Sequence, residues 1–226
     1  MKLLLFDLDG TLLMTGGAGL RALDRAFHTL YGISCVVDGV SMAGKTDPAI
    51  IRQVFEKTLG RLAGNRDVEE IGDKYLTFLN GEIKSSPGYH VMEGVQELLE
   101  NLVGREDVLL ALGTGNLERG ARIKMERGGL NPYFLFGGFG SDAEDRREVL
   151  KTAVRRGEER VNRPFALKDI FVIGDTILDV RAGKAIGAVT VAVGSGFGQE
   201  ADLRASRPDL YIDSFLKAGL FYKLLN

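Results

Sequence analysis

Short apolar runs alternate with longer amphipathic segments over most of the chain. The apolar runs predict strands, and they cover residues 2–6, 107–112, 133–136, 170–173, 189–193 and 210–212. Apolar residues that recur every three or four positions predict helices at 94–102, 117–127, from about 145, and 177–185. Strands that alternate with helices imply a parallel sheet covered by helices on both faces. The pattern therefore predicts an α/β fold.

The segment from residue 15 to residue 87 departs from this alternation, because it contains helical patterns and no good strand. We expect helices over residues 20–30 and 68–79, and a third that begins with Asp47 as its cap and Pro48 in its first turn. Glycine-rich residues 14–19 and the Ser85-Ser86-Pro87-Gly88 stretch read as linkers on either side. The prediction is a discontinuous core of residues 1–14 and 88–226, with a small all-helical domain of residues 15–87 inserted after the first strand.

Charge and composition exclude some functions. The 29 basic and 31 acidic side chains give a net charge of −2, so no overall basic field favours nucleic acid. No apolar run is long enough to span a membrane, and the apolar start of the chain is cut by Asp7, so we expect a cytoplasmic protein without a membrane partner. Cys35 stands beside two valines and is predicted to be a small buried hydrophobe. His28 and His90 lack metal-ligand spacing and are expected to be structural or exposed.

Two carboxylates follow the first strand directly, in Asp7-Leu8-Asp9-Gly10-Thr11. Open α/β sheets bind ligands at the carboxyl ends of their strands. Alternation along an extended chain sends Asp7 and Asp9 to the same side, and Gly10 permits a sharp turn beneath them. Two acids held this close suit one task in particular: one attacks while the other moves a proton, and a hard cation offsets their repulsion.

Two further strand ends carry polar side chains. Thr114-Gly115-Asn116 follows one strand, and a hydroxyl beside free amides at a helix start can cradle phosphate oxygens, although Asn116 could also be a helix cap. Asp175 and Asp179 follow another strand and are four residues apart, so they can share one side of a helix and bind a cation. The alternatives are a helix cap for Asp175 and a solvated first-turn acid for Asp179.

These strand ends resemble the motifs of the haloacid dehalogenase-like (HAD) superfamily. The resemblance implies a HAD-like Rossmannoid three-layer core with a helical C1 cap that closes over the site. It also implies that Asp7 is a nucleophile that forms an aspartyl-phosphate, and that Asp9 is the general acid/base and gives a backbone carbonyl to Mg²⁺. Dehalogenating members lack an acid at the position of Asp9, which favours phosphoryl transfer.

The same resemblance assigns the other motif residues. Thr114 would hydrogen-bond the transferring phosphoryl group, with the amides of Gly115 and Asn116 beside it. Asp175 would be a direct Mg²⁺ ligand, and Asp179 a ligand through water or an acceptor behind the first ligands.

The family's third motif, a lysine often followed by prolines, has no clear counterpart. Its stretch here is residues 142–151, where Arg146 is the favoured cation and Arg147 and Lys151 are the alternatives. In the helical segment, the loop 42–47 resembles the substrate loop of phosphoglycolate phosphatase-like members. Lys45 in that loop would reach an anionic leaving group, or else it is an ordinary surface lysine.

The resulting hypothesis is a Mg²⁺-dependent phosphatase acting on a small phosphorylated metabolite: a phosphoglycolate-like compound, a sugar phosphate or a nucleotide. The alternatives are a phosphomutase of the β-phosphoglucomutase type, a phosphonate hydrolase that uses Lys45, and a non-catalytic metal-dependent binding module. A monomer and a homodimer are both compatible with the sequence.

Overall fold

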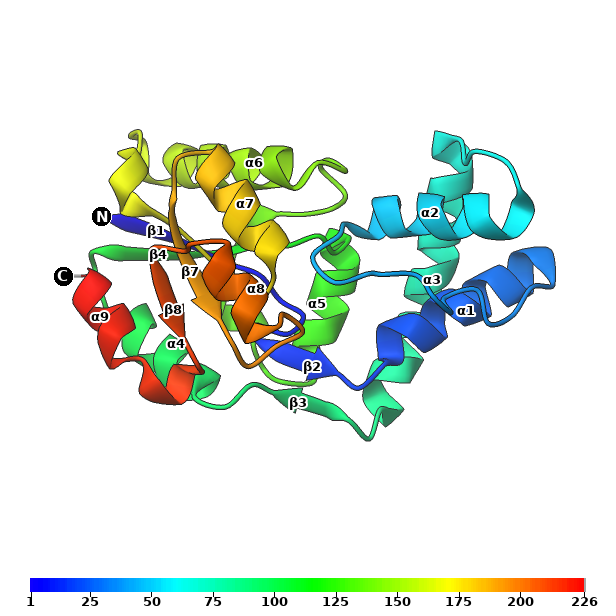
Figure 1. Ribbon diagram of the computed structural model, residues 1–226, viewed down its shortest axis with the longest axis horizontal. Helices are drawn as coiled ribbons and strands as arrows, with labels where there is room; N and C mark the ends of the chain where they lie inside the picture. The colour runs from blue at the N-terminus through cyan, green and yellow to red at the C-terminus, as the bar shows by residue number, and fades with distance from the viewer. Residues whose placement is uncertain (226) are drawn as a thin grey trace.

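A six-stranded parallel sheet forms the centre of the computed structural model, which describes residues 1–225 (Figure 1). The strands lie in the order β5-β4-β1-β6-β7-β8, and their bounds are β1 Lys2–Phe6, β4 Val108–Gly113, β5 Gly137–Gly138, β6 Ile170–Gly174, β7 Val189–Val193 and β8 Leu210–Ile212. Strand β1 pairs with β4 on one side and β6 on the other, so the ends of these three strands meet at one edge.

Helices cover both faces of this sheet. Their bounds are α4 Val95–Val103, α5 Glu118–Glu126, α6 Arg146–Val161, α7 Ile177–Ala185, α8 Glu200–Ala205 and α9 Gly219–Leu225, with 3-10 turns at Asn131–Tyr133, Leu167–Asp169 and Phe215–Lys217. Alternate residues of β1 enter different apolar clusters: Leu4 and Phe6 join one, and Leu3 and Leu5 join another. The sheet is therefore the middle of three layers, as the strand periodicity requires.

Three helices lie at one end of the molecule (Figure 1). They are α1 Ala18–Tyr31, α2 Asp47–Leu59 and α3 Asn65–Ser85, and they enclose an apolar cluster of their own around Phe27, Phe55 and Ile71. The chain enters and leaves this part through β2 Leu13–Thr15 and β3 Tyr89–Val91, which pair antiparallel. A Cβ on Gly16 would lie 2.6 Å from the Cα of Gly88, so the two connections approach too closely for a larger residue. The division into domains at residues 14/15 and 87/88 stays a prediction.

The predicted α/β class with a parallel sheet is confirmed, and several local expectations were wrong. Residues 131–133 form a 3-10 turn, and the edge strand pairs only at Gly137 and Gly138, directly after its predicted end at residue 136. The side chain that caps α2 belongs to Thr46, which accepts from the amide of Ala49, and Asp47 is already helical. Strands β2 and β3 and helices α8 and α9 had no predicted counterpart.

Cys35 is exposed, contrary to the prediction of a buried residue. Its backbone is left-handed, with φ of 58°, and the next side chain, Val36, is the buried one. Among residues 1–225, no helix combines the length and apolar character that crossing a membrane requires.

Candidate active site

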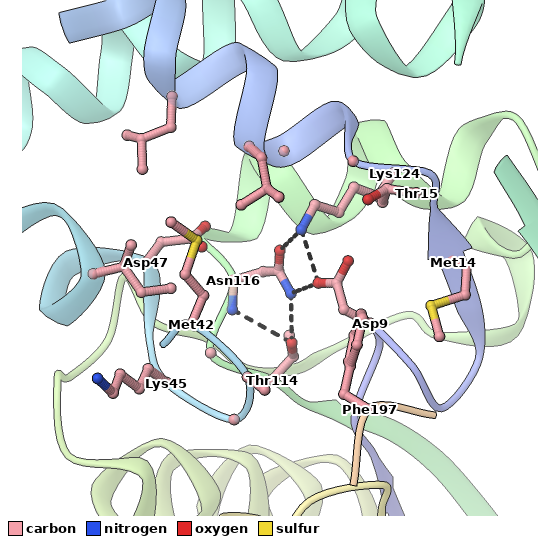
Figure 2. A pocket seen from close by; sticks show the side chains of 18 of the residues that line it. Asp9, Met14, Thr15, Met42, Lys45, Asp47, Thr114, Asn116, Lys124 and Phe197 are labelled. Carbon is pink, nitrogen blue, oxygen red and sulfur yellow. Dashed lines mark hydrogen bonds and ion pairs between the residues drawn. The ribbon is translucent and has the colours of Figure 1, made fainter. Parts of the chain in front are cut away.

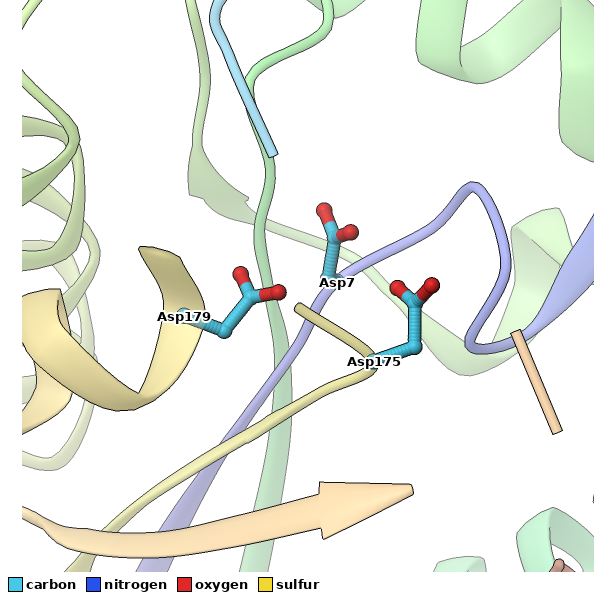
Figure 3. Close-up of side chains that lie close together, drawn as sticks. All are labelled: Asp7, Asp175 and Asp179. Carbon is cyan, nitrogen blue, oxygen red and sulfur yellow. The ribbon is translucent and has the colours of Figure 1, made fainter. Parts of the chain in front are cut away.

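The ends of β1 and β4 open into a cavity of about 580 Å³ between the sheet and the three-helix part (Figure 2). Seven residues singled out in the sequence line this cavity: Asp7, Asp9, Lys45, Thr114, Gly115, Asn116 and Arg146. The remaining two, Asp175 and Asp179, lie beside Asp7 (Figure 3). The fold thus brings together, from five separate stretches of chain, all nine residues that the motifs indicated.

Asp7, Asp175 and Asp179 form one buried carboxylate cluster, with oxygen atoms within 4.8 Å of one another. None of the three residues is more than 6% exposed. Asp175 is held from two sides, because the hydroxyl of Thr11 donates to Oδ1 at 3.1 Å and the amide of Phe197 donates to Oδ2 at 2.6 Å. The loop after β7 therefore borders the site and orients one of its acids.

Arg146 brings a guanidinium into this cluster from the first residue of α6. Its Nη2 lies 2.8 Å from Oδ1 of Asp7 and also binds Asp179. The two alternative cations point elsewhere: Arg147 binds Asp145, and Lys151 binds Glu148, at the surface. Asp145 caps the helix by accepting from the amide of Arg147, which leaves Arg146 at the first helical position, facing the sheet edge.

Asp179 is anchored within its own helix as well as to Arg146. Its Oδ2 accepts from the amide of Thr176 at 3.0 Å and from the Thr176 hydroxyl at 2.6 Å, which completes a capping box. The helix cap is therefore Thr176 and not Asp175, and Asp179, at 1% exposure, is not a solvated acid.

The electrostatics of the cluster favour a cation. Burial, and to a lesser degree the charge of Asp179, raises the pKa of Asp7 to about 6, against the opposing effect of Arg146. Burial raises the pKa of Asp175 well above its ordinary value, and the charges of Asp179 and Asp7 add to this. The cluster holds three carboxylates and one guanidinium, which contacts Asp7 and Asp179, so negative charge is in excess. A hard divalent cation, which prefers carboxylate oxygens, fits this donor set.

Asp9 lies in a different environment, paired with Lys124 of α5. The Lys124 ammonium donates to Oδ2 of Asp9 at 2.8 Å and to the side-chain oxygen of Asn116 at 2.5 Å. The Asn116 amide nitrogen donates to the same Asp9 oxygen at 2.8 Å, which closes a three-residue network (Figure 2). Burial opposes the charged form of Lys124, but the charges of Asp9, Tyr75 and Asp47 hold its pKa above the ordinary value.

Lys124 is the functional candidate that sequence reasoning missed. It lies between Ala121 and Met125, both fully buried, and is itself only 5% exposed. A lysine on the apolar face of a predicted helix is the signal that could have revealed it, because a buried ammonium needs a partner.

The Thr114 hydroxyl is fully buried and accepts from the Asn116 side chain at 2.8 Å. Asn116 does not cap α5, since Leu117 occupies the cap position. Gly115 meets the loop before α2: its carbonyl accepts from the amide of Asp47 at 2.7 Å, and a Cβ there would lie 2.9 Å from the Cα of Thr46. Only glycine permits this contact between the sheet edge and the helical part.

Lys45 lines the cavity, but its ammonium binds Oε1 of Gln53 at 2.7 Å. Figure 2 shows this ammonium directed away from Asp9 and Thr114. Of the two histidines, His90 lines the cavity and contacts the Gly88 carbonyl, whereas His28 contacts Ser34 away from it.

Comparison with known proteins agrees with these motifs. Residues 4–193 match the model of the family described as haloacid dehalogenase-like hydrolase. A phosphoglycolate phosphatase of Aquifex aeolicus is 28% identical over 92% of this chain and 93% of its own length. The phosphoglycolate phosphatase of Synechococcus elongatus is 25% identical over 95% of this chain and 93% of its own length. The structure of CbbY from Rhodobacter sphaeroides in complex with phosphate has a TM-score of 0.75 at 17% identity, covers 97% of this chain and 96% of its own, and so shares the fold.

Proposed function

The chain belongs to the haloacid dehalogenase-like hydrolase family, and from that premise we propose that it is a Mg²⁺-dependent phosphatase of small phosphorylated metabolites. The observation that carries the proposal is the setting of Asp7. Its carboxylate lies at a cavity wall, 2.8 Å from the Arg146 guanidinium, with Thr114 and Asp9 lining the same cavity. A nucleophile, a cation and a hydroxyl at one strand edge are the parts that phosphoryl transfer requires.

Mg²⁺ would be held by the carboxylates of Asp7 and Asp175 and by the backbone carbonyl of Asp9. Asp179 would contribute only through water, because Arg146 and Thr176 already occupy its oxygens. When bound, the ion would neutralise charge on the phosphoryl oxygens and offset the repulsion among the carboxylates.

The protein groups divide the chemistry between them. A carboxylate oxygen of Asp7 attacks phosphorus and forms an aspartyl-phosphate, while the bond from phosphorus to the ester oxygen breaks. Asp9, which enters the step protonated, gives its proton to that leaving oxygen. It then takes a proton back from the water that attacks the aspartyl-phosphate, which releases inorganic phosphate and frees Asp7. Arg146 balances the charge of the phosphoryl group, and the Thr114 hydroxyl donates to one of its oxygens.

Lys124 and Asn116 act as positioning residues for Asp9. Both donate to Oδ2 at 2.8 Å, which leaves Oδ1 as the oxygen available to exchange a proton with the leaving group or with water. Fixing a catalytic carboxylate through a second layer of donors keeps it at the productive geometry.

The test is phosphate release from a panel of phosphorylated metabolites, measured with Mg²⁺ and with EDTA. The proteins are the wild type, Asp7→Asn, and the control Asp213→Asn, whose exposed carboxylate lies outside the cavity. We expect release that requires Mg²⁺ and is lost in Asp7→Asn alone. Equal release by Asp7→Asn and wild type, or no release from any compound, would overturn the proposal.

A further inference from the structure

The cavity that contains Asp7 and Asp9 is largely apolar on the side opposite the strand ends, which we call the upper wall. The three-helix part contributes Leu20, Leu23, Met42, Ile50 and Ile51, and the loop after β7 contributes Phe197. The charged and hydroxyl groups of the proposed chemistry lie at the strand ends below. A substrate whose phosphate lies on the strand ends therefore directs its leaving group toward apolar side chains.

Two of these apolar side chains are exposed to water, and a bound substrate would cover them. Leu20 is 44% exposed and Phe197 is 52% exposed, although most large apolar residues of this chain are buried. They come from α1 and from the loop after β7, and both line the same cavity. An apolar body bound there would remove both from water, which is favourable in proportion to the area covered.

Of the lysine and arginine side chains among the described residues that line the cavity, two are paired with carboxylates, and the third, Lys45, is bound to a neutral amide and directed away. Arg146 binds Asp7 and Asp179, Lys124 binds Asp9, and Lys45 binds Gln53 and points away. His90 contacts the carbonyl of Gly88. The carboxylate of Asp47 also lines the cavity and would repel a further negative charge.

We propose that the preferred substrate is a phosphate monoester of an uncharged alcohol with an apolar body larger than glycolate. This proposal rests on the proposed phosphatase function and narrows its substrate class. A cavity of about 580 Å³ lies in the range that holds a ligand considerably larger than phosphoglycolate. A carboxylate on the leaving group would be desolvated against apolar walls without a partner, which is costly.

Three probes separate the two parts of the proposal. Ethyl phosphate and phosphoglycolate differ by the carboxylate, whereas ethyl phosphate and n-hexyl phosphate differ by the apolar body. We expect kcat/KM for hexyl phosphate to exceed that for ethyl phosphate by about tenfold or more, since apolar pockets discriminate by such factors. We also expect phosphoglycolate to be no better than ethyl phosphate.

A charge placed in the upper wall tests the residues. Leu20→Lys should lower kcat/KM for hexyl phosphate about tenfold and raise it for phosphoglycolate, because it exchanges apolar contact for a cation. The matched control is Leu62→Lys, an exposed leucine of the helical part outside the cavity, which should change neither.

The outcomes distinguish this inference from the function on which it rests. If phosphate is released but phosphoglycolate equals or exceeds hexyl phosphate, or if Leu20→Lys changes both substrates by the same factor, the inference alone is overturned. If no compound gives Asp7-dependent release, the proposed function fails, and the inference fails with it.

Discussion

Asp7 and Asp9 are separated by one residue but lie in opposite electrostatic environments. Asp7 is 6% exposed and shares its surroundings with two other carboxylates and one guanidinium. The Asp9 side chain is 27% exposed and pairs with Lys124. Alternation along the chain sends both acids to the cavity, but the partners that meet them come from different helices, α6 and α5.

The difference indicates how two like acids can take different roles. Three carboxylates and Arg146 leave a formal excess of two negative charges around Asp7, which a divalent cation would neutralise. The Asp9–Lys124 contact is balanced and leaves one carboxylate oxygen without a contact to Lys124 or Asn116. We interpret the first environment as one that binds an ion and a phosphoryl group, and the second as one that holds a proton carrier in place.

The largest expected effect is the loss of activity when the Asp7 carboxylate is removed. In Asp7→Asn, an amide replaces the nucleophile, so kcat for phosphate release should fall at least a thousandfold. In Asp9→Asn, kcat should fall by about a hundredfold to ten-thousandfold, as expected for the loss of a general acid/base. Steady-state phosphate release, with circular dichroism to check folding, measures both. A smaller loss in Asp7→Asn than in Asp9→Asn would reverse the assigned roles.

Removing the single guanidinium should be the largest effect on stability. Arg146→Ala leaves Asp7 and Asp179 buried without their cation, which should cost roughly 3–5 kcal/mol of unfolding free energy. The matched control is Arg147→Ala, since its exposed pair with Asp145 should contribute about 1 kcal/mol or less. Urea denaturation measures both, and Arg146→Lys serves if the alanine variant does not fold. Equal losses at positions 146 and 147 would contradict the interpretation.

The raised pKa of Asp7 predicts how the metal-free protein responds to pH. Burial raises this pKa from 3.8 to about 6, so the folded state holds the proton more tightly than the unfolded state. The stabilisation is full below about pH 4 and is lost as the pH rises through about 6, which amounts to about 3 kcal/mol. The measurement is the difference in unfolding free energy between wild type and Asp7→Asn in EDTA, from pH 4 to 7. A difference that does not change with pH would be inconsistent with the burial of Asp7.

Removing the lysine that positions Asp9 should give the smallest effect on activity. Lys124→Met removes a donor to Asp9 without touching substrate, so kcat should fall on the order of ten- to a hundredfold while KM changes little. Lys151→Met, at an exposed lysine of α6, is the control and should have no effect. If KM rises and kcat is unchanged, Lys124 binds substrate instead of positioning Asp9.

Much of the fold and several site residues could be predicted because the signals are local. An apolar strand followed by Asp7 and Asp9, or by Thr114, specifies both its structure and its position, since parallel strands of one sheet present their carboxyl ends at the same edge. The preference for Arg146 agrees with its contact to Asp7. Short elements were harder to predict. Strand β5 is only two residues long and helix α8 only six, so neither has a periodicity to recognise.

By itself, the sequence determined the α/β class and the acids at the strand ends, because alternation and helical period are properties of neighbouring residues. Only the tertiary structure decided which partner each acid meets. Asp9 and Lys124 are 115 positions apart, and their contact depends on the packing of α5 into the apolar cluster that it shares with β1 and β4. The tertiary structure also decided the apolar upper wall of the cavity. Leu20 and Phe197 lie near opposite ends of the chain and share a cavity only once the helical part packs against the sheet edge.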